Sequence, residues 1–446
     1  MSATATPTCE LIRPGDDAYD STRRVFNGAV DRRPALIARC HDAADVAWAV
    51  RHARSEGLAL AVRAGGHSMA GRSVPEDGVV VDVRGLRSVE IDPAARTARV
   101  GAGLLLGELD HATQAHGLAV PAGTVSHTGL AGLTLGGGIG WLSPRLGLTI
   151  DSLRAVELVT AEGELVRASE DEHPDLFWAV RGAGGSIGAV TSFELDLHPV
   201  GPLVVAGPRL YPFERAAEVL AIVGSLDLHG ELGLGCAIVT VPPAPHFPAE
   251  LHGSKALVVV PVWSGDQADA PAALAPLAAL GEPLLDAVGP MPYVALQSML
   301  DDTAPHGLHY RTTAAHLTAL DATAAGTLAA RFADVPGPRT HVVVTRLGGA
   351  VARVHAEATA FAHRDATWLA WTIGVWEPRE DATPHESWVV GMRDAVRPLA
   401  VPGVYVNALD GDPDGAEAAY GPALARLRET KRRWDPEGVF PGATDL

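Results

Sequence analysis

Apolar residues follow two different periods in the first two hundred residues of the chain. Short runs rich in β-branched and aliphatic side chains, at 35–40, 58–66 and 78–86, are typical of strands. The stretch 42–57 instead repeats its apolar positions at helical spacing. Alternation of this kind predicts an α+β region, two layers deep, between about residues 34 and 198.

The pattern breaks between His198 and Pro202, where two prolines lie close together. We place a domain boundary near Pro202 and extend the second region to about residue 403. Strand-like runs and an alanine-rich helical stretch mix there, a pattern typical of a sheet covered by helices. These segments are 202–213, 255–263, 321–333 and 340–349.

Composition narrows the classes of partner. With 446 residues and 47% apolar side chains the chain can bury a large core. Its 53 acidic and 35 basic residues give a formal charge of -18, which argues against nucleic acid or an anionic membrane, because phosphate binding needs clustered lysine and arginine. Cys9, Cys40 and Cys236 are too scattered for a disulfide framework, and no spacing predicts a metal site. Without a signal peptide or an apolar run of ~18 residues, the expected location is the cytoplasm.

Three glycine-rich segments carry the candidate chemistry. Residues 63–71 read RAGGHSMAG and directly follow an apolar run, so His67 stands between glycines that let a flat ligand approach the backbone. The other two segments are 121–142, PAGTVSHTGLAGLTLGGGIGWL, and 175–185, DLFWAVRGAGG. Converging backbone N–H groups in such loops suit a pyrophosphate. A histidine that only hydrogen-bonds within its loop is the alternative for His67, and also for His127.

Together these segments resemble the FAD-binding domain of the vanillyl-alcohol-oxidase (PCMH-type) flavoproteins, and more narrowly the berberine-bridge-enzyme-like oxidases of bacterial secondary metabolism. The resemblance implies a PCMH-type FAD-binding domain of two subdomains at 1–202, a substrate domain with an antiparallel sheet covered by helices at 203–403, and a C-terminal segment at 404–446 that returns to the first domain. It implies FAD joined to His67 through the flavin 8α carbon. The other expected cofactor residues are Arg63, Gly65, Gly66, Ser68, Met69, Val125, Gly129, Gly132, Gly136, Gly137, Gly138, Gly140, Gly188, Val190, Tyr405 and Asn407.

Two positions depart from the family pattern. Many relatives attach the flavin a second time through a cysteine where this chain has Val125, so we expect a single linkage. Many relatives also have a catalytic aromatic residue where this chain has Ala408, which cannot accept a proton. Among Tyr310, Arg311, Arg346 and His363 we rank Tyr310 first as the replacement base, with an arginine, preferably Arg346, to lower its pKa. Asn407 is expected among the catalytic residues together with Tyr310 and Arg346, where it would fix a loop or touch the flavin.

The resemblance favours an oxidase that acts on a small organic substrate and passes the electrons to dioxygen. We expect the substrate to be a natural product. One alternative is a flavin-dependent oxygenase acting on a polyketide-like intermediate. Another, motivated by Ala408, is a non-redox cyclase or a flavin scaffold. The expected oligomeric state is a monomer or homodimer.

Overall fold

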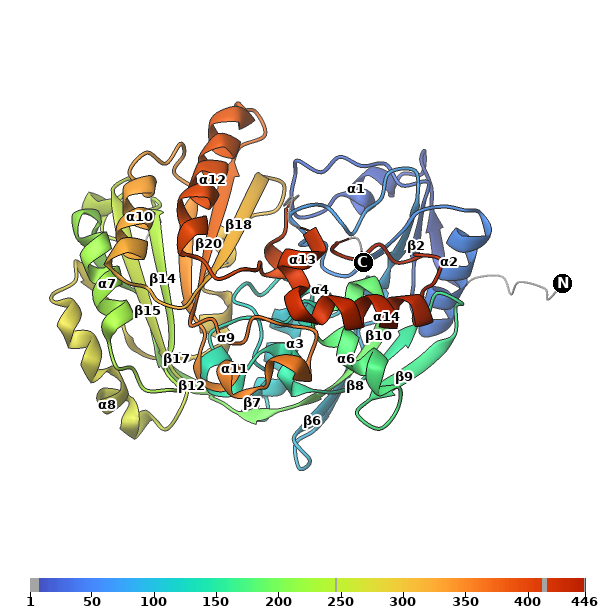
Figure 1. Ribbon diagram of the computed structural model, residues 1–446, viewed down its shortest axis with the longest axis horizontal. Coiled ribbons are helices and arrows are strands. Elements are labelled where there is room, and N and C mark those ends of the chain that lie inside the picture. The colour runs from blue at the N-terminus through green and yellow to red at the C-terminus, as the bar shows by residue number, and fades with distance from the viewer. Residues whose placement is uncertain (1–7, 245–246, 411–414, 445) are drawn as a thin grey trace.

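The computed structural model describes residues 8–244, 247–410, 415–444 and 446, which form two halves lying side by side (Figure 1). Residues up to about 200 make the half on the right of that view. Residues 203–396 make the half on the left, a large antiparallel sheet with helices on one face. The predicted α+β class, with a helix-covered antiparallel sheet in the second half, is confirmed.

The first half contains two main sheets. In the four-stranded sheet, of order β1-β2-β4-β3, strands β2, β4 and β3 are parallel and β1 is antiparallel to β2. The five strands of the other sheet, of order β5-β6-β10-β8-β9, are all antiparallel. The strands, with the small pair β7 and β11, are β1 Glu10–Ile12, β2 Leu36–Arg39, β3 Leu60–Arg63, β4 Val79–Asp82, β5 Val89–Asp92, β6 Thr97–Gly101, β7 Leu118–Ala119, β8 Leu153–Val159, β9 Leu165–Ser169, β10 Ala189–Asp196 and β11 His198–Pro199.

The second half is built on one nine-stranded antiparallel sheet. Its main path is β16-β13-β15-β14-β19-β20-β18, and β12 joins β15 to β17. The apolar runs at 202–213, 255–263 and 340–349 that predicted strands all lie in this sheet. The strands are β12 Leu203–Ala206, β13 Arg209–Pro212, β14 Gly233–Thr240, β15 Lys255–Trp263, β16 Leu285–Asp286, β17 Gly289–Pro292, β18 His309–Leu317, β19 His341–Arg346 and β20 Trp368–Trp376.

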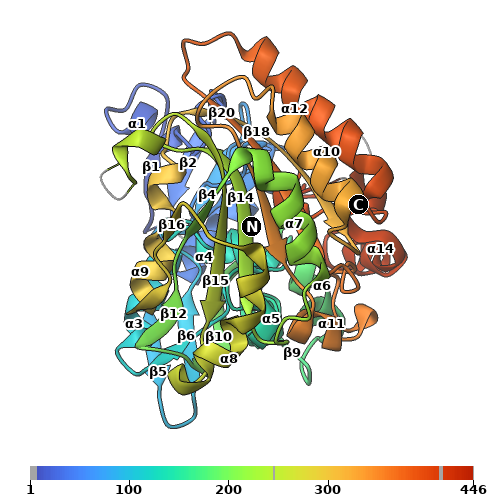
Figure 2. The same ribbon diagram turned by 90° about the vertical axis from the view of Figure 1, so that its left-hand side faces the viewer.

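Helices α7, α10 and α12 cover one face of this sheet, and Figure 2 shows them along one side of β14 and β15. They bury large apolar side chains there, including Leu328, Phe332, Trp388 and Met392, which leaves the opposite face of β18–β20 free to line a cavity. The α-helices of the chain are α1 Tyr19–Arg23, α2 Ala43–Ser55, α3 Leu106–Gln114, α4 Leu130–Leu135, α5 Ser143–Leu146, α6 Pro174–Ala183, α7 Ala216–Ser225, α8 Ala270–Leu274, α9 Tyr293–Ser298, α10 Ala322–Phe332, α11 Gly349–Arg353, α12 Ala382–Val396, α13 Gly415–Tyr420 and α14 Leu424–Trp434.

Aspartates fix where several helices begin. The carboxylates of Asp42, Asp321 and Asp381 accept backbone N–H groups in the first turns of α2, α10 and α12. Such caps satisfy donors that have no partner inside the helix. Among the described residues, no helix combines the length and the apolar character needed to cross a membrane.

The C-terminal segment crosses back over the first half, where α14 lies beside α6 (Figure 1). Leu424, Leu427 and Phe440 are buried in the same core as Phe177 and Trp178 of α6. Apolar burial therefore holds the end of the chain against the region that begins it.

One buried carboxyl lies between the two halves. Asp110 of α3 is 2% exposed and accepts a hydrogen bond from Gln297 Nε2 of α9 at 3.1 Å. Burial raises the pKa of Asp110 from 3.8 to about 7. The folded chain therefore retains a proton that the unfolded chain releases, and the free energy of unfolding falls as pH rises from 4 to 7.

The variant Asp110→Asn should lose this pH dependence. Between pH 5 and pH 8, the free energy of unfolding of the wild type should fall by about 2 kcal/mol more than that of the variant, because the amide binds no proton at either pH. Urea unfolding at both pH values measures the difference, and the exposed Asp334→Asn serves as a control. Parallel pH profiles for wild type and Asp110→Asn would show that the carboxyl is ionised in the folded chain.

Candidate active site

A cavity of about 420 Å³ lies between the glycine loops of the first half and the uncovered face of the sheet in the second. A volume of this size is in the range of ligand and cofactor sites. The C-terminal segment closes part of its wall through Tyr405–Asn407 and 440–443. Three stretches that are far apart in sequence thus meet around one space.

Most of the residues predicted to hold the cofactor line this cavity. The loop after β3 and the loop that leads into α4 come so close that a Cβ on Gly65 would lie 2.3 Å from the Gly129 nitrogen. Only glycines permit this approach. The predicted cofactor residues at the cavity are Gly65, Gly66, His67, Ser68, Met69, Val125, Gly129, Gly132, Gly136, Gly140, Gly188, Val190, Tyr405 and Asn407.

Three predicted cofactor residues do not line the cavity. Arg63 ends β3 and turns its buried guanidinium to the carbonyls of Thr22 and Arg24, so it anchors the N-terminal segment. Gly137 and Gly138 have φ of 127° and 82° and form the turn after α4, where Gly138 N–H donates to the Tyr405 hydroxyl at 3.3 Å. These two glycines shape the loop by their backbone conformation.

The sheet contributes an apolar wall. Val343 of β19 and Leu369, Trp371 and Ile373 of β20 line the cavity, and the alternate positions of these strands face the helices instead. His341 also lines this wall, and burial lowers its pKa, so its imidazole is neutral. A ligand on this side meets mostly hydrocarbon.

Three histidines cluster at one end of the cavity. His67 Nε2 lies 2.9 Å from His127 Nδ1, and a ring nitrogen of each of His67, His127 and His306 lies within 4.8 Å of the others. His67 stacks on Phe26, with ring centroids 4.2 Å apart. Three imidazoles at this spacing could also hold a transition-metal ion, although the sequence predicted no metal site.

The environment of His67 keeps its ring uncharged. Burial, followed by the neighbouring imidazoles of His127 and His306, lowers the pKa of His67 to about 3. A neutral imidazole has one nitrogen with a free lone pair. His67 is therefore able to act as a nucleophile at any pH near neutrality.

Asn407 and Tyr405 brace the glycine loop beside α4. Asn407 Nδ2 donates to the Leu133 carbonyl and to the Tyr405 hydroxyl, both at 3.0 Å. A Cβ on Gly136 would lie 2.1 Å from Asn407 Oδ1. The predicted loop-fixing contact of Asn407 is present in the structure.

The expected pairing of Tyr310 with Arg346 is wrong. Tyr310 of β18 pairs with Val375 and Arg346 of β19 with Trp368, at opposite ends of β20. Arg346 Nη1 instead donates to the carbonyls of Leu232 and His229, at 2.8 and 2.9 Å. Strand register, set by the long-range pairing of the sheet, separates the two side chains.

Tyr310 lines the cavity but is a poor proton acceptor. Its hydroxyl donates to the Pro305 carbonyl at 2.6 Å, and burial raises its pKa well above the usual value. Both properties keep the phenol protonated. The structure therefore disfavours the predicted role of Tyr310 as the base.

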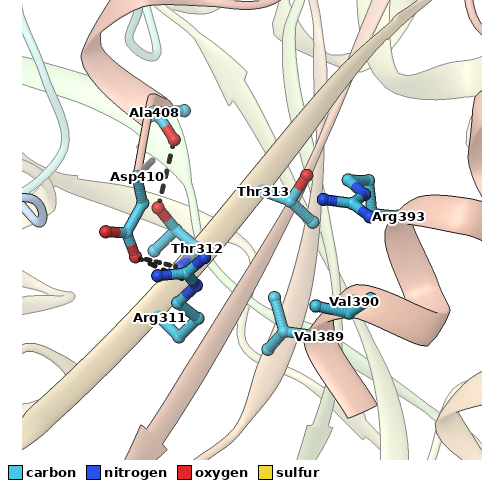
Figure 3. Close-up of a pocket in the computed structure, with 8 residues that line it drawn as sticks. All are labelled: Arg311, Thr312, Thr313, Val389, Val390, Arg393, Ala408 and Asp410. Carbon is cyan, nitrogen blue, oxygen red and sulfur yellow. Dashed lines mark hydrogen bonds and ion pairs between the residues drawn. The ribbon is translucent and has the colours of Figure 1, made fainter. Parts of the chain in front are cut away.

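Arg311 and His363, the other two candidates for the base, do not line the large cavity. Arg311 faces a second, small cavity and forms an ion pair with Asp410 at 3.7 Å (Figure 3). Ala408 also lines that cavity, and its carbonyl accepts from Thr312 Oγ1 at 3.2 Å. His363 is 7% exposed and its Nε2 lies 3.1 Å from the Ala419 carbonyl.

Sequence reasoning missed two residues that position the histidine cluster. Asn27 donates to the carbonyls of Met69 and Tyr310, at 2.7 and 3.0 Å, and so ties the His67 loop to β18. Asp301 accepts from the backbone and hydroxyl of Ser126, beside His127. No sequence pattern marks either residue, because the contacts join segments that are 42 to 283 positions apart.

The cavity has the properties that a flavin nucleotide needs. Gly132 and Gly185 line it, and a Cβ on either would meet nothing within 4 Å, so open space lies over both. Within the described chain, Ser73 Oγ and Trp371 Nε1 are buried at the cavity without a hydrogen-bond partner. A polar ligand would satisfy such groups. The residues present thus fit FAD, the cofactor that the family resemblance implies.

Comparison with known proteins agrees with this geometry. Residues 34–169 match the family described as FAD binding domain, and residues 404–442 match the family described as berberine and berberine like. The chain is 31% identical over 443 residues to an FAD-linked oxidoreductase of Dictyostelium discoideum, an alignment that covers 98% of this chain and 94% of that protein. It is 42% identical over 198 residues to (R)-6-hydroxynicotine oxidase of Paenarthrobacter nicotinovorans, covering 44% and 43% of the two chains. The crystal structure of 6-hydroxy-D-nicotine oxidase from Arthrobacter nicotinovorans superposes with a TM-score of 0.87 and 26% identity, over 100% of this chain and 99% of that one.

Proposed function

Because the chain belongs to the berberine-bridge-enzyme-like family of FAD-linked oxidoreductases, we propose that it carries FAD on His67 through a single covalent bond and oxidises a small organic molecule with dioxygen. The observation that carries this proposal is the position of His67 at the wall of the large cavity, between the glycine loops, where burial lowers the pKa of its imidazole. Val125, at the position of the second attachment in many relatives, supports a single bond because its side chain cannot form a thioether.

In this proposal each part of the chain has its own task. Residues 1–202 and 404–446 hold the cofactor, with the loops 65–69 and 129–140 against its polar and ring atoms. Residues 203–403 cover the substrate. Bound FAD supplies the two-electron acceptor, and dioxygen takes the electrons from it.

The chain's own residues orient the substrate and exclude water. The apolar wall of Val343, Leu369, Trp371 and Ile373 favours a substrate with a hydrocarbon face. Removal of water from this face strengthens the few polar contacts that remain. Asn407 keeps the loop beside α4 in place through the Leu133 carbonyl.

The test is anaerobic mixing of the purified enzyme with a panel of apolar alcohols and amines. A true substrate should bleach the flavin absorbance without oxygen, and air should restore it with one hydrogen peroxide per turnover. Labelled dioxygen separates an oxidase from an oxygenase, because an oxidase leaves no label in the organic product. Incorporation of the label would replace the proposed oxidase with the oxygenase.

Tyr310→Phe is expected to keep turnover within about threefold of the wild type, because the hydroxyl already donates to Pro305 and is not free to accept a proton. Loss of a general base would cost about 100-fold or more. Steady-state turnover with a bleaching substrate across pH measures the effect. Tyr211→Phe, a buried tyrosine of the helix-covered core, is the matched control. A loss of 100-fold confined to Tyr310→Phe would reinstate Tyr310 as the base.

A further inference from the structure

The large cavity offers few groups that could take a proton from a substrate. Among the described residues that line it, none is an aspartate, glutamate, lysine or cysteine. Its tyrosines are Tyr310, Tyr405 and Tyr420, and burial raises the pKa of each, so the phenols stay protonated. The imidazoles of His67 and His341 remain. Because the proposed function commits His67 to FAD, His341 is the group left for the substrate.

His341 stands on the sheet wall of the cavity, at the end that meets the His67 loop. It begins β19 and pairs with Ile373 of β20, which lines the same wall. Ile373 packs against the apolar cluster that contains Phe26, and Phe26 stacks on His67. A substrate held by His341 would therefore lie between the sheet and the loop that holds the cofactor in the proposed function.

A backbone contact fixes the tautomer of His341. Its Nδ1 lies 2.8 Å from the carbonyl oxygen of Arg339. A carbonyl oxygen can only accept a hydrogen bond, so Nδ1 carries the ring proton and Nε2 keeps its lone pair. Nε2 is not one of the described chain's buried polar atoms without a partner, and no described residue bonds to it, so it meets open space.

We propose that His341 is the catalytic base of this site and that its Nε2 accepts the hydroxyl proton of a neutral alcohol, the task for which Ala408 has no side-chain group. Histidine is the side chain that most often acts as a general base. The inference rests on the proposed function and adds to it the class of substrate and the residue that activates the substrate.

The charges at the cavity favour an alcohol over an amine. An aliphatic amine, like the lysine side chain, is a cation at neutral pH. The described wall has no carboxylate to pair with such a cation, and its charged side chain, Arg72, would repel one. A neutral hydroxyl compound carries no such penalty, and Val343, Leu369 and Ile373 can cover its hydrocarbon face.

Oxidation of the alcohol releases one proton, and one hydrogen with two electrons. The O–H bond breaks, its proton passes to His341 Nε2, and the electron pair left on oxygen forms the second bond of a carbonyl group. The C–H bond on the same carbon breaks, and its hydrogen leaves with both electrons to the bound FAD. Dioxygen later takes these two electrons with that hydrogen and the proton held by His341. Hydrogen peroxide forms, and the imidazole returns to its neutral state.

The test compares wild type with His341→Gln, both loaded with FAD. The glutamine amide can hydrogen-bond a hydroxyl, but it takes no proton near neutral pH. His309→Gln is the matched control, because His309 belongs to β18 of the same sheet and does not line the cavity. Benzyl alcohol, indanol and fluorenol, each beside the amine of the same skeleton, are mixed anaerobically with the enzyme. The concentration dependence of flavin bleaching gives the limiting rate and the dissociation constant.

We expect the alcohols to bleach wild type faster than the matching amines do. His341→Gln should lower the limiting rate about 100-fold or more, the usual contribution of a general base, with a dissociation constant within about threefold of the wild type. His309→Gln should match the wild type. The FAD content and the thermal unfolding temperature of the three proteins should agree, which separates the loss of a base from the loss of structure.

NMR of isotope-labelled histidine gives a second measurement that needs no turnover. The signal of His341, identified by its absence in His341→Gln, should show the ring proton on Nδ1. If His341→Gln does not hold FAD, this signal decides, because a ring proton on Nε2 would leave no lone pair there for the substrate.

A loss of less than about tenfold in His341→Gln, or a ring proton on Nε2, would overturn the role of His341 while leaving the oxidase intact. Faster bleaching by the amines, or FAD-loaded wild type that no alcohol of the panel bleaches, would overturn the substrate class. A wild type that never carries FAD would refute the proposed function itself.

Discussion

Replacing Arg364 with methionine is expected to lower the free energy of unfolding by about 3–5 kcal/mol, because the change leaves the Asp151 carboxylate buried without its cation. Arg364 and Asp151 form a two-pronged ion pair at 2.7 and 2.8 Å, and their side chains are 3% and 9% exposed. The pair joins the segment before β20 to the loop after α5. Its loss should therefore weaken the contact between the two halves that frame the cavity.

Urea unfolding of the purified variants measures this effect. The control is Arg154→Met, which removes an ion pair with Asp196 whose side chains are 54% and 45% exposed, and should cost less than about 1 kcal/mol. The double variant Arg364→Met with Asp151→Asn should lose less than the sum of the two single changes. Equal losses for Arg364→Met and Arg154→Met would mean that the buried pair does not stabilise the fold.

Replacing Gly65 with alanine is expected to lower the free energy of unfolding by about 3 kcal/mol and to reduce the FAD content strongly. The new Cβ would lie 2.3 Å from Gly129 N and 2.6 Å from Gly129 Cα, and both are backbone atoms that cannot rotate away. The loop that carries His67 and the loop that follows His127 would have to separate. The covalent fraction by intact mass, together with thermal unfolding, measures both consequences.

Gly326→Ala is the matched exchange for that experiment. Gly326 lies within α10, and a Cβ there meets nothing within 4 Å, so alanine should stabilise the helix by about 0.5–1 kcal/mol. Normal stability and a full FAD content in Gly65→Ala would show that the two loops are not held as closely as the structure has them.

The glycine-rich segments by themselves predicted tight loops that a flat ligand could approach, and the family resemblance placed Gly65, Gly129 and Gly136 among the expected cofactor residues. All three lie at the cavity wall, where the close approach of Gly65 to Gly129 leaves no room for a side chain. Arg63 was expected in the same cofactor cradle as Gly65 and Gly66, as part of the segment 63–71. As the last residue of β3, it turns to the side away from the cavity, toward Thr22 and Arg24.

Contacts between distant segments could not be predicted. The separation of Tyr310 from Arg346 depends on how β18 and β19 register against β20, which pairing across the sheet determines. His306 meets His127 across the two halves of the chain. Such contacts depend on how the two halves of the chain pack against each other. A single sequence carries no local signal for them.

The most direct test of the central claim is the intact mass of the acid-denatured protein, for wild type and His67→Ala. Wild type should keep its flavin through acid precipitation, with a mass increased by one FAD less two hydrogens, and His67→Ala should release all of it. Release of the flavin from wild type, or retention of a covalent flavin by His67→Ala, would contradict it.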